Sequence, residues 1–339
     1  MPSFRSGTVT EILSERAGLQ RVLVDGERAY VVTQLTGTVA VGDRVVMNTT
    51  AVELGLGTGG WHVVHWNLAR DSLDAPGPGH IMKLRYTSLQ VDAGADETIA
   101  DDDDLDGMPV IACGLHSQVP CVAVALRHAR PDVRIAYVMT DGAALPMAMS
   151  DLVDALGPLL ATTITAGHAF GGQHEAVNVP SALLTARRHA DVAIVGMGPG
   201  VVGTATKLGF SALEVGSILG ATSLLGGRPV AALRFSLADA RLRHQGVSHH
   251  TTTALSLGTE ARATLGVPRG EFEARVRADL DAAGVSDRHR LLAVDDPGIP
   301  ALLDAAGLRV TSMGRAPADD PGFYAVAGAA GTAAATLLR

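Results

Sequence analysis

The chain has 339 residues, of which 47% are hydrophobic and 18% charged, so it can bury a large core and is long enough for two domains. Its net charge is −8 and it has no basic cluster, which disfavours nucleic acid as a partner. The N-terminus lacks the apolar stretch of a secretory signal, and no apolar run reaches the roughly 20 residues of a membrane-spanning helix. We therefore expect a cytoplasmic protein without a membrane partner.

Residues 1–91 contain short segments that alternate in hydrophobicity or are rich in Val, Thr and aromatic residues. Turn residues such as Asp25 with Gly26, and Gly42 with Asp43, separate these segments. Several short strands at close spacing predict a small antiparallel β-barrel domain. The expected strands are residues 7–13, 19–24, 29–33, 43–48 and 61–66.

An acidic segment, 92–107, separates this domain from the rest of the chain. We interpret it as a solvated linker, because the spaced Asp and Gly positions of an EF-hand are missing from the run 101–104. From residue 108 to 339, predicted strands alternate with helices, which indicates a mostly parallel, doubly wound (Rossmann-like) α/β sheet. The expected strands are 110–113, 133–139, 162–165, 192–197, 229–235, 289–294 and 308–311, and an Ala/Gly-rich helix is expected within 323–338.

Histidines gather in the segments that follow these predicted strands. Ligands of an open α/β sheet bind beyond the carboxyl ends of its strands, so these side chains would share one end of the domain. Each histidine alone is more often a turn residue with a local hydrogen bond, and only the clustering favours a site. Six of the 12 histidines belong to this set: His116, His168, His174, His244, His249 and His250.

Neutral imidazoles together with carboxylates are typical of a divalent metal site for Zn, Mn or Fe, in which a bound water becomes a nucleophile near neutral pH. Ser248 can cap a helix that begins at His249, and a helix N-terminus disfavours imidazolium. No fixed-spacing motif such as H-E-x-x-H is present. The expected metal ligands are His168, His174, Glu175 and His249, and the expected catalytic groups are His116, Asp141 and His250. Adjacent histidines cannot readily both bind one ion from a helix. One of the pair is therefore expected to lie next to the ligands without binding the ion itself.

A glycine-rich loop follows the predicted buried strand 192–197. Gly198, Gly200 and Gly203 match G-x-G-x-x-G, so backbone N–H groups there could approach an anion closely. The match is weak for a dinucleotide site, because it follows the fourth strand of the domain and lacks an acidic residue about 20 positions later. Thr204 stands where a P-loop has its lysine, which disfavours a nucleotide triphosphatase. Further anion contacts are expected from Thr204, Lys207, Arg241 and Arg243, although solvated surface side chains are the plainer interpretation of the last three.

Several segments resemble one bacterial family. The resemblance rests on CGLHSQ (113–118), YVMTDGAALP (137–146), GHAFGG (167–172), HEAVN (174–178), GMGPGVVGT (196–204), LGFS (208–211) and GVSHHT (246–251), with VGDRVVMNTTAVELGLGTGG (41–60) and HIMKLRYT (80–87) in the front part. On these motifs the chain is identified as a member of the family catalogued as domain of unknown function 3866, over nearly its whole length. The resemblance implies one intact protein of that kind, and it transfers no catalytic residue.

Three interpretations of function remain open. The first is a metal-assisted hydrolase or transferase that acts on a small anionic compound, such as a phosphorylated one, at the carboxyl edge of the sheet. The second is a non-catalytic module that binds or senses a nucleotide or another small anion. The third is a scaffold whose Ala/Gly-rich tail forms a homodimer.

Overall fold

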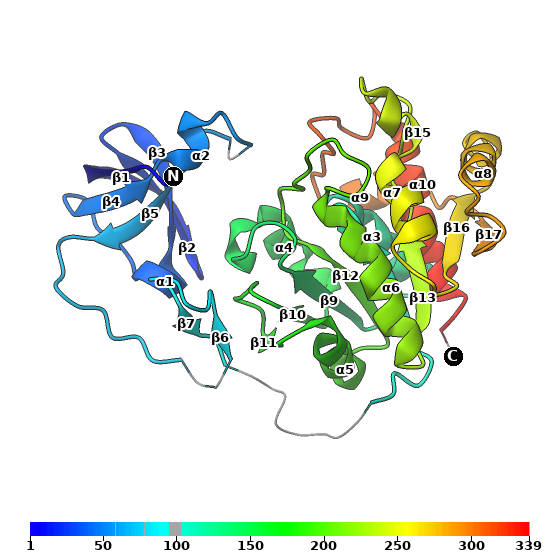
Figure 1. Ribbon diagram of the computed structural model, residues 1–339, viewed down its shortest axis with the longest axis horizontal. Coiled ribbons are helices and arrows are strands. Elements are labelled where there is room, and N and C mark those ends of the chain that lie inside the picture. Colours follow the sequence, from blue (N-terminus) through cyan, green and yellow to red (C-terminus); the bar gives the residue numbers. More distant parts are fainter. Residues whose placement is uncertain (58, 78, 80, 95–102, 339) are drawn as a thin grey trace. The chain divides into compact units, whose positions relative to one another are not determined.

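The computed structural model describes residues 1–57, 59–77, 79, 81–94 and 103–338. The chain divides into two compact units, Met1–Gly94 and Ala95–Arg339 (Figure 1). Residues 95–102, which make up half of the predicted acidic linker, lie outside the described residues. No described helix combines the length and the apolar character that crossing a bilayer requires.

The first unit is a closed barrel with the strand order β1-β2-β3-β5-β4, which confirms the predicted barrel. Its neighbouring strands are antiparallel except for β3 and β5, which run parallel. Inward side chains such as Val22, Val31, Val45 and Val64 form its core. The elements are β1 (Phe4–Arg16), β2 (Leu19–Val24), β3 (Glu27–Val32), α1 (Thr33–Thr36), β4 (Arg44–Asn48), α2 (Thr50–Glu53), β5 (His62–Asn67), β6 (Met82–Lys83) and β7 (Val91–Asp92).

The second unit is built on a parallel sheet of eight strands in the order β11-β10-β9-β12-β8-β13-β16-β17, as expected for a Rossmann-like domain. Hydrogen bonding in one register, such as Ala193 opposite Val110, aligns the carboxyl ends of the central strands. The strands are β8 (Pro109–Cys113), β9 (Ile135–Thr140), β10 (Thr162–Thr165), β11 (His174–Glu175), β12 (Val192–Met197), β13 (Arg228–Ala232), β16 (Thr264–Pro268) and β17 (Arg290–Val294).

Helices cover both faces of this sheet (Figure 1). Successive residues of a strand point to opposite faces, so Ile111 and Cys113 of β8 enter one core while Val110 and Ala112 enter the other. The first core is closed by α3 (Gln118–Ala129), α4 (Asp151–Leu156), α9 (Ile299–Ala305) and α10 (Pro321–Ala335). The second is closed by α5 (Val179–His189), α6 (Glu214–Leu224), α7 (His249–Leu257) and α8 (Glu273–Ala282).

Some predicted elements differ from the structure. Residues 308–311 were expected to form a strand, but they are irregular. The strand β16, between β13 and the edge strand β17, was not predicted. The predicted strand 229–235 ends at Ala232, so that Arg234 lies in the connection beyond it. The Ala/Gly-rich helix α10 is almost wholly buried within its own unit, against α3 and the sheet, which leaves little of it for a partner subunit.

The connections leave β8 and β12 in opposite directions along the sheet. From β8 the chain passes through α3 to β9 on one side, and from β12 it passes through α6 to β13 on the other. Such a reversal between adjacent strands opens a crevice at their carboxyl ends, where ligands of doubly wound sheets bind. The loops beyond this edge are therefore the part of the fold in which a site is expected.

Candidate functional site

Three histidines, His244, His249 and His250, converge beside the carboxyl edge of the sheet, and we call them the histidine cluster. One ring nitrogen of each lies within 4.8 Å of a ring nitrogen of the others. The ring centroids are 4.4 to 5.0 Å apart. His244 ends the short turn η5 (Leu242–His244), and the other two begin α7. One of this adjacent pair was expected not to bind the ion, but at the first turn of α7 both His249 and His250 offer a ring nitrogen to the cluster.

Ser248 holds the cluster in place. As predicted, it caps α7, because its Oγ accepts a hydrogen bond from the backbone N–H of His250 at 3.2 Å. The same Oγ lies 2.7 Å from Nδ1 of His244. One hydroxyl therefore fixes both the start of the helix and the orientation of the His244 ring.

The three imidazoles are kept neutral. Burial, followed by the Arg234 guanidinium, lowers the pKa of His244 and that of His250 to about 3. Burial and the nearby Arg243 also lower the pKa of His249. In the described part of the chain, Nε2 of His249 is buried without a hydrogen-bond partner. A neutral imidazole with an unused nitrogen is the form that binds a metal ion.

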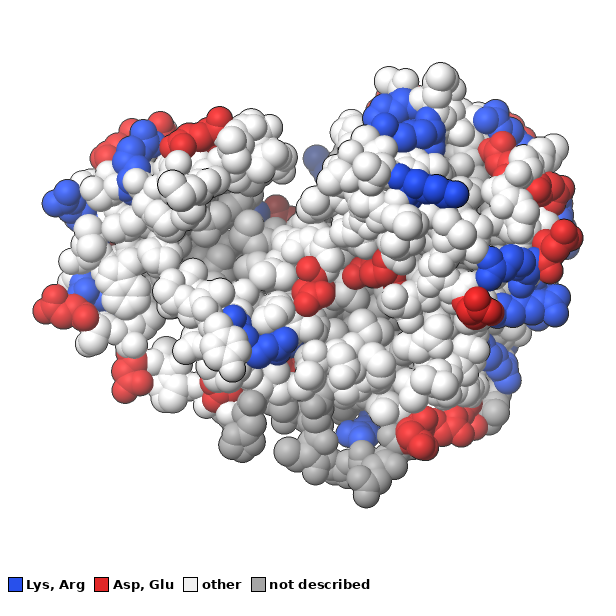
Figure 2. Space-filling view, viewed as in Figure 1, with Lys and Arg blue, Asp and Glu red and all other residues white. Residues whose placement is uncertain are grey.

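Arginines border the cluster. Nη1 of Arg234 lies 3.3 Å from Nδ1 of His250, and its Nη2 lies 3.5 Å from Oδ2 of Asp239. Asp239 is only 3% exposed and also accepts two hydrogen bonds of 2.9 Å from the side chain of Arg241, which hold the pKa of Asp239 far below its usual range. Arg315 lies 3.6 Å from the same carboxylate. Figure 2 shows basic side chains gathered over the segment that carries β15 (Gly246–Val247), where Arg241 and Arg243 are exposed.

Phe210 joins the glycine-rich loop to the cluster. Its ring stacks on His250 with a centroid distance of 4.0 Å and an interplanar angle of 2°, and meets His249 edge-on at 5.7 Å. The loop itself is closed by backbone hydrogen bonds from Thr204 to Gly209 at 2.7 Å and from Ser211 to Val202 at 2.9 Å. Lys207 and Thr204 are exposed on it.

The glycines of this loop have structural roles of their own. A Cβ at Gly198 would lie 2.6 Å from the carbonyl oxygen of Ala144, and Gly200 adopts a φ of +104°. Gly203 pairs with Phe210 in an isolated bridge. Close packing and turn geometry thus account for these glycines, and the N–H groups of Val202 and Thr204 donate to Ser211 Oγ and to the carbonyl of Gly209.

His116 lies where β8 and β12 diverge, but its two nitrogens are both engaged. Nδ1 donates to the carbonyl of Met197 at 3.1 Å, so Nε2 accepts from the hydroxyl of Ser150 at 2.7 Å. Burial lowers the pKa of His116 to about 4. This arrangement ties three loops together around a neutral histidine.

A pair of carboxyl groups lies at the end of β9. Oδ2 of Asp141 accepts a hydrogen bond of 2.9 Å from the backbone of His168, and Oε1 of Glu214 accepts one of 2.7 Å from Thr140 Oγ1. Burial raises the pKa of Glu214 to about 7, and the charge of Asp141 acts in the same direction. The sequence did not indicate Glu214 as an acid–base candidate. Its spacing from Ser211 is that of a capping box, which gives such a carboxylate a structural role at the start of a helix. No side chain among the described residues caps α6, and Ser211 Oγ instead accepts from the backbone of Val202 at 3.2 Å.

The structure does not bring His174 and Glu175 to the histidine cluster. Both belong to β11, which is five positions from β13 in the sheet, or about 24 Å at the usual strand spacing. Oε1 of Glu175 accepts from the backbone of Gly171 at 2.7 Å, and the His174 ring stacks on His189 at 4.3 Å. The four expected metal ligands are therefore dispersed, with His168 near Asp141 and His249 in the cluster.

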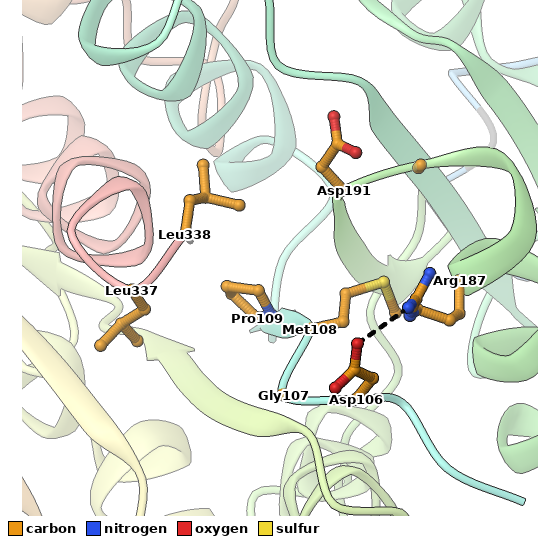
Figure 3. A pocket seen from close by; sticks show the side chains of 9 residues that line it. Asp106, Gly107, Met108, Pro109, Arg187, Asp191, Leu337 and Leu338 are labelled. Carbon is orange, nitrogen blue, oxygen red and sulfur yellow. Dashed lines mark hydrogen bonds and ion pairs between the residues drawn. The ribbon is translucent and has the colours of Figure 1, made fainter.

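Two of the cavities lie at opposite ends of the sheet. One of about 210 Å³ lies at the amino ends of β8 and β12, where an ion pair of 3.1 Å joins Arg187 to Asp106 (Figure 3). The other, of about 10 Å³, lies between α6 and α7 and is lined by Arg234 and His250. A space of that size holds about one water molecule.

The sequence was compared with known proteins. The model of one protein family, described as "Protein of unknown function (DUF3866)", matches residues 28–331, nearly the whole chain. Neither the curated proteins nor the solved structures contain a match.

Proposed function

The chain belongs to the DUF3866 family of proteins of unknown function, and we propose that it is a metal-assisted hydrolase or transferase acting on a small anionic compound. The observation that carries this proposal is the convergence of His244, His249 and His250 within 4.8 Å. Three histidines are a ligand set that zinc uses in catalytic sites, where a water or substrate takes the remaining position. A metal-bound water ionises near neutral pH and can attack an electrophilic centre.

The surroundings of the cluster support a metal of this kind. The unpartnered Nε2 of His249 is a buried lone pair for which the described residues offer no donor. Ser248, 2.7 Å from Nδ1 of His244, supplies the orienting hydrogen bond that ligating histidines usually have on their second nitrogen. Metal binding would therefore satisfy a ring nitrogen that folding alone leaves unsatisfied.

The arginines indicate the charge of the substrate. Arg234, Arg241 and Arg243 surround the cluster, and Asp239 compensates only part of their charge. A carboxylate or phosphate group that binds the metal would meet guanidinium groups at the same place. Glu214, with its pKa raised to about 7, is available at the same edge of the sheet to exchange protons.

Metal content is the decisive test of this proposal. We expect protein purified without a histidine tag to bind zinc or manganese and to gain activity on phosphomonoesters or similar anionic esters when the metal is added. His249→Gln should weaken zinc binding by about tenfold or more, whereas His128→Gln, a change at an exposed position at the end of α3, should leave it unchanged. Absence of bound metal, with no activity on adding either ion, would rule the proposal out.

A non-catalytic anion-binding module is the second candidate. It is favoured by the three guanidinium groups, which repel a cation and attract an anion. Thermal unfolding in the presence of nucleotides and small phosphates separates the two candidates. A rise in melting temperature with a ligand that is never converted would favour binding alone.

A further inference from the structure

We infer that Arg234 and the metal ion compete for His250, and that metal binding frees the Arg234 guanidinium to hold an oxyanion on the metal. This inference rests on the proposed metal site. It adds to that site a residue that would regulate its occupancy and select its substrate.

The competition follows from the direction of one hydrogen bond. Arg234 Nη1 is 3.3 Å from His250 Nδ1, and a guanidinium can only donate. Nδ1 of His250 is therefore the acceptor, and in the neutral ring the proton sits on Nε2. The burial of Arg234 and the Phe210 ring, which stacks on His250 at 4.0 Å, hold this arrangement.

Metal binding is incompatible with that hydrogen bond whichever nitrogen is used. If Nδ1 binds the metal, its lone pair is no longer available to Arg234. If Nε2 binds the metal, the ring proton moves to Nδ1 and faces the Nη1–H of Arg234. In both cases the guanidinium must leave His250.

The freed guanidinium has a defined place beside the metal. Arg234 is 6% exposed, and the Asp239 carboxylate that lies 3.5 Å from it already takes two hydrogen bonds from Arg241. N–H donors of Arg234 would then remain unpaired in a buried position next to the ligand histidines. A carboxylate or phosphate oxygen bound to the metal would satisfy them, so metal and oxyanion should strengthen each other's binding.

The test measures zinc affinity in the full chain by competition with a chelating indicator, with and without inorganic phosphate. Arg234→Met removes the donors while nearly keeping the side-chain volume in a site lined by Gly114, Ala212 and Ala231. Asp239 keeps Arg241 as a partner in this variant. Arg262→Met, at an exposed position before β16, removes the same charge elsewhere in the unit and serves as the matched control.

We expect Arg234→Met to bind zinc about tenfold more tightly than the unchanged chain when phosphate is absent. Phosphate should tighten zinc binding in the unchanged chain and in Arg262→Met, but not in Arg234→Met. Equal zinc affinities with an unaltered phosphate effect would overturn the inference and leave the metal site standing. If neither the unchanged chain nor Arg234→Met binds zinc, the proposed function itself is overturned, and the inference with it.

A second measurement needs no variant at Arg234. Long-range ¹H–¹⁵N spectra distinguish the two neutral tautomers, and the His250 signals are identified by their loss in His250→Gln. The metal-free chain should carry the proton on Nε2 of His250. A proton on Nδ1 would show that Arg234 is not its donor and would overturn the inference even if Arg234→Met did not fold.

Discussion

Glu214 shows how a half-buried side chain acquires a pKa that its sequence context does not indicate. Its carboxyl group accepts a hydrogen bond from Thr140, and a Cβ at Gly142 would lie 2.8 Å from its Oε2, so it is pressed against the end of β9. Removal from water disfavours the charged form, and this effect outweighs the hydrogen bond that favours it. The result is a carboxyl group that titrates near neutral pH.

Replacing Glu214 by Gln should make the protein more stable at alkaline pH. The folded chain keeps the Glu214 proton up to about pH 7, whereas the unfolded chain loses it near pH 4.5, so this group costs stability increasingly as the pH rises between these values. Urea unfolding at pH 5 and pH 8 should show nearly equal stability at the lower pH and a gain of up to about 3 kcal/mol for Glu214→Gln at the higher. Glu260→Gln, at an exposed position, should show no such difference, and an equal pH dependence of both variants would contradict the burial argument.

His116 makes the stability of the protein depend on pH in the opposite direction, at acid pH. Its pKa falls from 6.5 to about 4 on folding. Between these pH values the unfolded chain binds a proton that the folded chain does not bind, so the free energy of unfolding decreases as the pH drops. Compared with the unchanged protein, His116→Gln should lose less stability between pH 6.5 and 4, by up to about 3 kcal/mol. Denaturant unfolding over this range checks it, with the exposed His128→Gln as the variant that keeps the original slope.

At the scale of elements, the sequence predicted strands and helices best where apolar runs are long and clearly bounded. The strands 19–24, 162–165 and 192–197 have their predicted limits, because turn or helix-capping residues flank each run. β16 was missed because Thr264–Pro268 contains a glycine and ends in a proline, a composition that argues against a strand. The end of β13 was placed three residues too late, because Leu233 and Phe235 continue the apolar pattern of the strand on either side of Arg234. Arg234 was therefore taken as a strand residue and not as part of the connection beside the site.

The site was predicted only in part for a similar reason. The sequence places His244, His249 and His250 after one strand, and their closeness follows from a short connection and a helix cap. Whether His174 joins them depends on the order of the strands in the sheet, which is set by packing between distant segments. No spacing within the sequence records that order.

The helices α3 and α10 can pack closely because Gly331 of α10 has no side chain. A Cβ at Gly331 would lie 2.4 Å from the carbonyl oxygen of Val122, so Gly331→Ala should push the two helices apart and lower the free energy of unfolding by about 1 to 3 kcal/mol. Gly220, also within a helix, has its nearest such neighbour at 3.9 Å. Gly220→Ala should therefore stabilise the protein by about 0.5 to 1 kcal/mol, and a loss of stability in both variants would show that helix packing is not the cause.

At the scale of the whole molecule, the barrel and the α/β sheet are separate compact units, and every residue of the histidine cluster belongs to the second. A fragment of residues 95–339 should consequently bind zinc with the affinity of the full chain. Circular dichroism would establish that the fragment is folded, and indicator competition would give its affinity. A folded fragment with affinity reduced tenfold or more would show that the barrel takes part in the site.

The strand order also affects how the protein can be made. β8 is the first strand of its sheet to be synthesised, but both of its neighbours, β12 and β13, come more than 75 residues later, as the pairs Ala193–Val110 and Val230–Ile111 show. On a ribosome, this apolar strand has no native partner until residue 197 has emerged, and long-range pairing of this kind is slow. The central strand of the finished domain is thus the one that must wait longest without its neighbours, and early chaperone contact should concentrate there.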